Sequence, residues 1–152
     1  MMPIAQPTRH ILLADDDKDD RTLFNQVLEE LPMLTQLEAV HNGERLMQRL
    51  YEERAQLPDV LFLDLNMPRK NGAQCLKEIR KKESLQHLPV IVLSTTSSED
   101  IVDAMYQSGA NLYIQKPSDF KMWKRAIAKV LNMDWNIHAP FSVKENFTLT
   151  EF

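Results

Sequence analysis

Five short apolar segments, each followed by a stretch with apolar residues at helical spacing, limit the folds open to this chain. The expected strands are residues 10–14, 37–41, 60–63, 89–93 and 111–114. The expected helices carry apolar stripes at residues 23–31, 46–51, 76–79, 101–106 and 120–131. Strands that are apolar throughout are typical of a parallel sheet with helices on both faces. The sequence therefore predicts an α/β fold in which a five-stranded parallel sheet is doubly wound.

Polar side chains follow the expected strands at the points where those strands end. The first strand is followed by Asp15, Asp16 and Asp17, the third by Asp64, the fourth by Ser94 and Thr95, and the fifth by Lys116 and Pro117. The second strand offers only His41 and Asn42. Ligands of doubly wound sheets bind beyond the carboxyl ends of the strands. Carboxylates, a hydroxyl group and an amine are therefore expected together at one edge of the sheet.

The carboxylates of Asp15, Asp16 and Asp64 need a positive charge beside them if they share that edge. Two carboxylates about 4 Å apart repel each other by roughly 4 kcal/mol at an effective dielectric constant of about 20. Mg²⁺ removes this repulsion, because it binds one or two carboxylates and phosphate oxygens while it keeps several waters. Beside the metal, an ionised Asp64 is competent as a nucleophile toward phosphorus. With Lys116 and Ser94 to contact phosphate oxygens, this set of residues suits phosphoryl transfer.

The segments ILLADDD, LFLDLNMP, PVIVLSTT and YIQKP, in this order and at this spacing, resemble the motifs of two-component response-regulator receiver domains. The resemblance covers residues 9–133 and implies the flavodoxin-like fold of chemotaxis-type receivers. The loop LNMPRKNG and the segment LSTTSSEDI are similar to those of small stand-alone receivers. The kinase partners implied by this likeness are sensor histidine kinases of the phytochrome or hybrid type.

The resemblance implies a role for each residue that matches a family motif. Asp64 matches the phosphoacceptor, which takes a phosphoryl group from a phosphohistidine on the kinase. For the Mg²⁺ site, Asp16 matches the direct ligand and Asp15 the acidic partner that holds a metal-bound water. Asn66 matches the position whose main-chain carbonyl completes the site, and its side chain matches one that tunes the lifetime of the phosphate.

The same resemblance implies a conformational switch. Ser94 matches the switch hydroxyl, and Lys116 matches the lysine that contacts the phosphate ahead of a cis-proline, here the structural residue Pro117. Tyr113 matches the aromatic switch residue, which turns inward when the hydroxyl is drawn to the phosphate. Thr96, like Asn66, matches a position that tunes phosphate lifetime.

Two features near these motifs leave alternatives open. Ser94 and Thr95 are adjacent hydroxyl residues, and the register of a single residue decides which of them reports the phosphate; the resemblance favours Ser94, because its distance from Asp64 fits the family. Asp17, Asp19 and Asp20 extend the acidic run beyond the usual pair. They either cap the first helix or strengthen the local negative field.

The expected organisation is an N-terminal extension at residues 1–8, a receiver domain at 9–133 and a C-terminal tail at 134–152. A tail of about twenty residues is too short for a DNA-binding output domain with its own core. Three fates remain open for it: packing back on the domain, pairing with a second copy, or staying mobile.

Charge, cysteine usage and hydropathy bound the cellular setting. A formal net charge of -4 argues against non-specific nucleic-acid binding, which needs a basic face. The single cysteine, Cys75, is expected in the core and suits a reducing cytoplasm. No apolar run approaches the length of a membrane span. We therefore expect a cytoplasmic protein with neither a nucleic-acid nor a membrane partner.

The function expected from these observations is that of a single-domain response regulator, a phosphoacceptor signalling protein rather than an enzyme, which promotes its own phosphoryl transfer and dephosphorylation. It would signal to a target protein or pass phosphate to a histidine phosphotransfer protein in a phosphorelay. A homodimer through the fourth helix, fifth strand and fifth helix is also expected. Two alternatives stay open: a non-phosphorylated scaffold, and a Mg²⁺-dependent phosphatase with an aspartyl-phosphate intermediate. Against the phosphatase, Asn66 stands where a second aspartate would follow Asp64.

Overall fold

The fold is known from a computed structural model that describes residues 7–135 and 147–149. Its elements, in chain order, are β1 (Arg9–Ala14), α1 (Lys18–Glu30), β2 (Thr35–Val40), α2 (Gly43–Leu50), β3 (Val60–Asp64), α3 (Gly72–Lys81), a 3₁₀ turn (Glu83–Leu85), β4 (Val90–Ser94), α4 (Glu99–Gln107), β5 (Leu112–Gln115), α5 (Phe120–Leu131) and β6 (Thr148–Leu149). The strands form one sheet in the order β2-β1-β3-β4-β5-β6, and every pair is parallel. The predicted α/β fold is confirmed, with a short sixth strand that the sequence did not predict.

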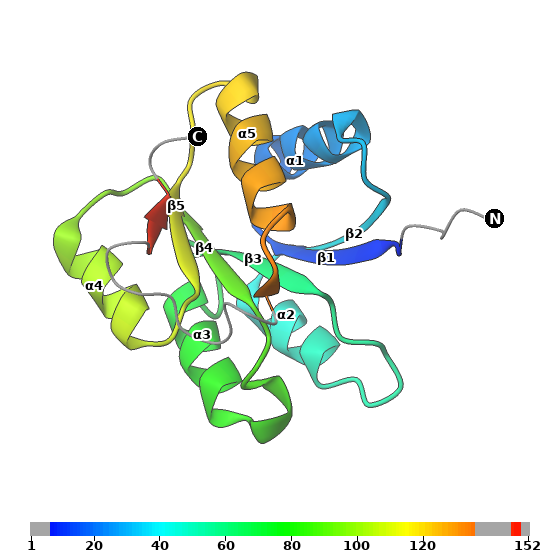
Figure 1. The fold of residues 1–152 in the computed structure, drawn as a ribbon. Helices are drawn as coiled ribbons and strands as arrows, with labels where there is room; N and C mark the ends of the chain where they lie inside the picture. The colour runs from blue at the N-terminus through cyan, green and yellow to red at the C-terminus, as the bar shows by residue number, and fades with distance from the viewer. Residues whose placement is uncertain (1–6, 136–146, 150–152) are drawn as a thin grey trace.

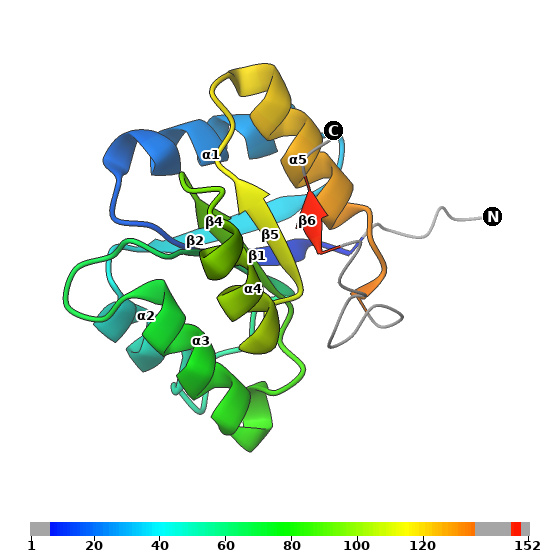
Figure 2. The same ribbon diagram turned by 90° about the vertical axis from the view of Figure 1, so that its left-hand side faces the viewer.

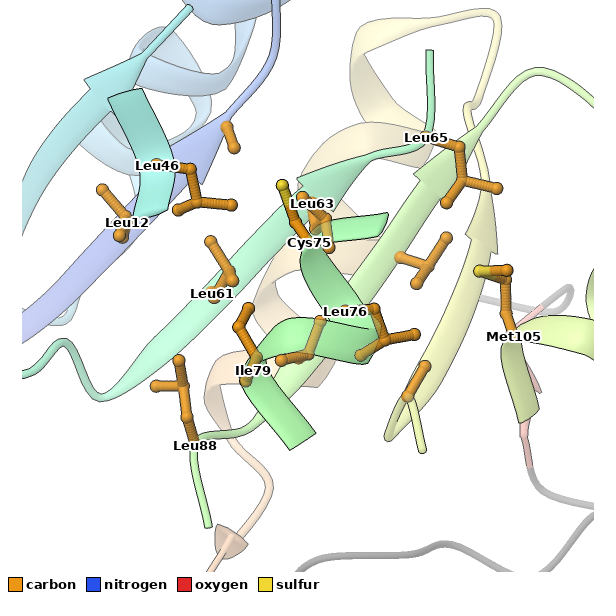
Figure 3. Packing of buried hydrophobic residues seen from close by; sticks show 14 of the residues in the cluster. Leu12, Leu46, Leu61, Leu63, Leu65, Cys75, Leu76, Ile79, Leu88 and Met105 are labelled. Carbon is orange, nitrogen blue, oxygen red and sulfur yellow. The ribbon is translucent and has the colours of Figure 1, made fainter. Parts of the chain in front are cut away.

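Helices cover both faces of the sheet. Helices α1 and α5 lie together on one face, and α2, α3 and α4 lie on the other (Figures 1 and 2). Each face has its own apolar cluster, and the side chains of β3 alternate between the two. Leu61 and Leu63 belong to the cluster under α2 and α3, shown in Figure 3, whereas Val60 and Phe62 belong to the cluster under α1 and α5. This double burial explains why the strand is apolar throughout.

Side-chain caps fix where the helices that flank the carboxyl edge begin. The Asp17 carboxylate accepts hydrogen bonds from the main-chain N–H groups of Asp19 and Asp20 at the start of α1. Asn71 caps α3 in a reciprocal capping box with Gln74. Asp119 caps α5 by accepting from the N–H of Met122. Of the two roles left open for the extended acidic run, capping therefore belongs to Asp17.

The tail returns to the domain at residues 147–149. Thr148 pairs with Tyr113 and Leu149 with Ile114, so β6 covers the outer edge of β5 (Figure 2). The N–H of Tyr113 donates to the carbonyl of Phe147 at 2.9 Å. These residues thus take the first of the three fates left open for the tail, packing back on the domain, while residues 136–146 and 150–152 lie outside the described part of the chain.

Phe147 anchors this returning segment. Its side chain is 1% exposed, and its ring lies 5.2 Å from that of Tyr106 and 6.3 Å from that of Tyr113, measured between centroids. The aromatic contacts join the tail, α4 and β5. Phe147 therefore extends the core on the α2–α4 side rather than lying on the surface.

Candidate functional site

Three carboxylates meet at the carboxyl edge of the sheet, as predicted. Asp15 follows β1 and Asp64 ends β3, and these strands are direct neighbours in the sheet. With Asp16, they place one carboxylate oxygen each within 4.8 Å of one another. Asp15 and Asp64 are buried, whereas Asp16 is exposed. Oxygen ligands of this kind and spacing fit a hard divalent cation that keeps some of its waters.

Lys116 brings one positive charge into this pocket from the loop that follows β5. Its ammonium lies 2.7 Å from the Asp20 carboxylate, 3.1 Å from that of Asp15 and 3.4 Å from that of Asp64. Its main-chain N–H donates to the carbonyl of Ser94 at 2.7 Å, which ties the loop to the end of β4. Burial alone would lower the pKa of Lys116, but the hydrogen bond that its ammonium donates to Asp20 and the charges of Asp15 and Asp64 outweigh burial and raise that pKa.

The electrostatic setting of Asp64 is unfavourable for its charged form. Burial, followed by the charge of Asp15, raises the pKa of Asp64 to about 7, against the opposing effects of Lys116 and the Asn66 main-chain N–H. That N–H donates to Asp64 Oδ1 at 3.2 Å. One lysine therefore does not compensate the buried carboxylates fully. A bound cation would complete the compensation and keep Asp64 ionised at neutral pH.

The backbone around Asp64 leaves no room for a larger residue at the start of α3. A Cβ atom added to Gly72 would lie 2.3 Å from the carbonyl oxygen of Asp64, a distance at which the backbone must shift. The N–H of Gly72 also donates to the carbonyl of Leu65, closing the loop between β3 and α3. Within this loop Arg69 has a positive φ of 69°. The position of Asp64 thus depends on the first turn of α3 as well as on β3.

The hydroxyl groups at the end of β4 lie in different environments. Ser94 is fully buried, and its Oγ accepts a hydrogen bond from the N–H of Thr96 at 3.2 Å. Thr95 is exposed. The Tyr113 hydroxyl donates to the carbonyl of Thr96 at 2.7 Å, and burial raises the pKa of Tyr113 although a hydrogen bond with Ser94 opposes the rise. The geometry therefore links Ser94, rather than Thr95, to Tyr113.

The other predicted site residues lie near the pocket in the chain, but no direct side-chain contact links them to the Asp64 carboxylate among the described contacts. Asn66 is exposed, two residues after Asp64, and Pro117 is half-buried after Lys116. Tyr113 is buried, and the ring of Phe147 lies beside it. For Asp20 the sequence left open a cap of the first helix or a contribution to the local negative field, but not the contact with Lys116, and it gave no role to Phe147. The place of Asp20 in the acidic run that follows the first strand could have indicated a further carboxylate near the pocket; no pattern in the tail pointed to Phe147.

Cys75 is a free, buried cysteine of α3, and burial raises the pKa of its thiol to about 11. Among the described helices, each is too short or too polar to cross a membrane.

Comparisons with known proteins place this arrangement in a family. The family model of the response regulator receiver domain matches residues 11–128. Response regulator Rcp1 of Synechocystis sp. is 34% identical over an alignment of 121 residues, which covers 77% of this chain and 82% of the relative. The Mn²⁺-bound structure of Rcp1 superposes with a TM-score of 0.77 at 32% identity, covering 83% of this chain and 96% of the other.

A further solved structure is similar to the same extent. The phosphorylated cyanobacterial phytochrome response regulator RcpA has a TM-score of 0.76 at 30% identity, covering 82% of this chain and 91% of that one. The family match includes Asp15, Asp16, Asp64, Ser94 and Lys116, the residues that the fold brings to one edge. The chain belongs to the response regulator receiver domain family.

Proposed function

We propose that Asp64 accepts a phosphoryl group from the phosphohistidine of a sensor histidine kinase, in a Mg²⁺-dependent reaction. The observation that carries this proposal is the convergence of the Asp15–Asp16–Asp64 cluster and the Lys116 ammonium on one buried carboxylate. Phosphoryl transfer depends on positioning and on charge stabilisation, and these groups supply both. Support also comes from RcpA, a similar protein whose solved structure is of its phosphorylated form.

In the proposed reaction, a carboxylate oxygen of Asp64 forms a bond to phosphorus while the bond from phosphorus to the kinase's imidazole nitrogen breaks. Lys116 donates hydrogen bonds to the phosphoryl oxygens, and the Ser94 hydroxyl does the same once it turns from Thr96. The side chains of Asn66 and Thr96, which match family positions that tune phosphate lifetime, would control the access of water to the phosphate. Mg²⁺, held by Asp15, Asp16, Asp64 and the Asn66 carbonyl, would neutralise the charge of the phosphoryl group.

The output we propose is a population shift at the face formed by α4, β5 and α5. Phosphorylation would draw Ser94 and Lys116 toward Asp64 and favour the inward position of Tyr113. The partners would be a histidine kinase, of the phytochrome type as the similarity to RcpA suggests, and a target or phosphotransfer protein. A homodimer at this face would also meet β6, because β6 covers the edge of β5. The buried free thiol of Cys75 agrees with a cytoplasmic location.

The test is to incubate the chain with acetyl phosphate and Mg²⁺ and to record its intact mass. We expect one added phosphoryl group that requires Mg²⁺, no adduct in Asp64→Asn, and an undiminished adduct in Asp100→Asn, a variant with the same change of charge at an exposed position of α4. An adduct that persists in Asp64→Asn would contradict the assignment of the phosphoacceptor. Failure of the parent chain to react with acetyl phosphate and to bind beryllofluoride would instead favour a scaffold.

Mg²⁺ binding is expected to weaken by about tenfold or more in Asp16→Asn, measured by isothermal titration calorimetry, because the variant loses one of the three clustered carboxylates. Asp19→Asn is the matched control, since Asp19 is exposed and lies outside that cluster. Equal affinities of the two variants would exclude Asp16 as a ligand.

Turnover of small phosphate esters by the parent chain would favour the phosphatase alternative over a signalling role.

A further inference from the structure

Asp20, in the first turn of α1, is the nearest partner of Lys116. Its Oδ2 lies 2.7 Å from the ammonium, compared with 3.1 Å for Asp15 and 3.4 Å for Asp64. An ammonium has three N–H donors, so each of them is engaged by a carboxylate. The longest of the three contacts is the one to the proposed phosphoacceptor. The lysine is therefore held toward α1 rather than toward Asp64.

Asp20 also differs from the other two partners in what else it can bind. Asp15 and Asp64 belong to the cluster that fits a cation, and a cation there competes with Lys116 for their oxygens. The Asp20 carboxylate comes from a different element, α1, and its side chain is 26% exposed. It remains available to Lys116 when the other two carboxylates are engaged elsewhere.

We propose that Asp20 is a positioning residue that restrains Lys116 on the α1 side of the pocket until a phosphoryl group is present on Asp64. The proposal rests on the function proposed above, in which Lys116 contacts the phosphoryl oxygens. Those oxygens must compete with Asp20 for the ammonium. The Asp20–Lys116 contact thus opposes the phosphorylated state, and its loss favours that state.

A role in capping α1 does not account for the Asp20 side chain. The cap is the Asp17 carboxylate, which accepts from the main-chain N–H of Asp20 and leaves the side chain free to reach Lys116. Replacement of the Asp20 carboxylate by an amide keeps this cap. Its effect on the helix dipole is shared by Asp19, which lies in the same first turn.

The experiment measures the affinity of the full chain for beryllofluoride, a phosphoryl mimic, in saturating Mg²⁺ by isothermal titration calorimetry. Asp20→Asn is expected to bind it roughly three- to fivefold more tightly than the parent, the range for a partly exposed ion pair. Asp19→Asn carries the same change of charge at an exposed position. Among the described residues, Lys116 bonds to Asp20 and not to Asp19, so this control should stay within about twofold of the parent.

A second readout needs neither metal nor phosphate. The rate at which acetic anhydride modifies the Lys116 amine, followed by peptide mass spectrometry, should rise in metal-free Asp20→Asn and stay unchanged in Asp19→Asn. Asp19→Asn removes a charge from the same turn of α1 but no hydrogen bond to Lys116, so a rate that rises equally in both variants would reflect the loss of charge alone and not a lost restraint.

Tighter beryllofluoride binding together with a more reactive Lys116, both confined to Asp20→Asn, would establish the restraint. Binding that is weaker than the parent's, or equal to that of Asp19→Asn, would overturn it. If the parent chain binds no beryllofluoride, the proposed function fails and with it the effect of Asp20 on phosphorylation. The amine reactivity then still decides whether Asp20 holds Lys116.

Discussion

Replacing Asp64 with asparagine is expected to raise the free energy of unfolding of the metal-free protein by about 2–4 kcal/mol above pH 7. The substitution removes a buried charge whose neighbours do not compensate it. Burial and the charge of Asp15 raise the pKa of Asp64 from 3.8 to about 7, so its charged form costs folding free energy. Asparagine has nearly the same shape and does not ionise.

The sign of the pH dependence follows from the same values. Between about pH 4 and pH 7 the folded protein keeps a proton on Asp64 that the unfolded chain has lost. Stability therefore falls as the pH rises through this window, by at most about 1.4 kcal/mol per pH unit, and the loss is complete above it. The gain from Asp64→Asn should be near zero at about pH 4 and largest above about pH 7.

Urea unfolding in the presence of a chelator, followed by tryptophan fluorescence between about pH 5 and pH 8, measures this difference. The control Asp100→Asn, at an exposed position, should differ little from the parent in its free energy of unfolding across this pH range. A difference that does not change with pH, or a variant less stable than the parent at about pH 8, would contradict the compensation argument. Added Mg²⁺ should stabilise the parent more than Asp64→Asn and so narrow the gap.

The sequence was sufficient to predict that Asp15 and Asp64 meet, because the geometry of parallel sheets determines this contact. Two buried strands that run in the same direction and lie side by side bring their carboxyl ends to one edge, whatever the loops do. Lys116 follows β5, whose carboxyl end lies at the same edge, although β4 separates β5 from β3. The boundaries of β2 were less predictable: its apolar pattern begins at Leu37, whereas pairing begins at Thr35. β2 is an edge strand with alternating partial exposure, so its first residues need not be apolar.

Two features could not be predicted from local pattern. The contact between Asp20 and Lys116 depends on the rotation of α1 against the sheet, which the spacing of apolar residues fixes only within a wide arc. The pairing of β6 involves two residues, too few for any periodicity, with a partner strand distant in the chain. From the sequence, Asp20 was only part of an acidic run, and residues 148–149 were only part of the C-terminal tail. In the structure, Asp20 contacts Lys116 and β6 pairs with Tyr113, two of the proposed switch residues.

Replacing Phe147 with alanine is expected to lower the free energy of unfolding by about 3 kcal/mol, the lower end of the range for a fully buried phenylalanine. Its ring is 1% exposed and packs on Tyr106 and Tyr113. The cost is limited because β6 pairs through only two residues, so the segment can detach instead of leaving a rigid cavity. This loss is a large fraction of the stability of an ordinary domain.

Urea unfolding gives the magnitude, and hydrogen exchange shows where the loss occurs. The N–H of Tyr113 donates to the Phe147 carbonyl, so detachment of the segment should speed exchange at this amide, while the amides of β1 and β3 should keep their protection. Thr148→Ala is the control within the same segment, because Thr148 is exposed and its replacement should cost less than about 0.5 kcal/mol.

Loss of the Phe147 contact should also change the position of the switch residue Tyr113. Phe147 covers the ring of Tyr113, whose hydroxyl donates to Thr96 beside Ser94. If the tail keeps Tyr113 inward, Phe147→Ala should lower the affinity for beryllofluoride as well as the stability, because the inward position is the one that phosphorylation is proposed to favour. Unchanged stability and unchanged exchange at Tyr113 would mean that the segment does not hold this ring. Reduced stability with unchanged beryllofluoride affinity would make Phe147 a packing residue whose contact is not coupled to the phosphorylation site.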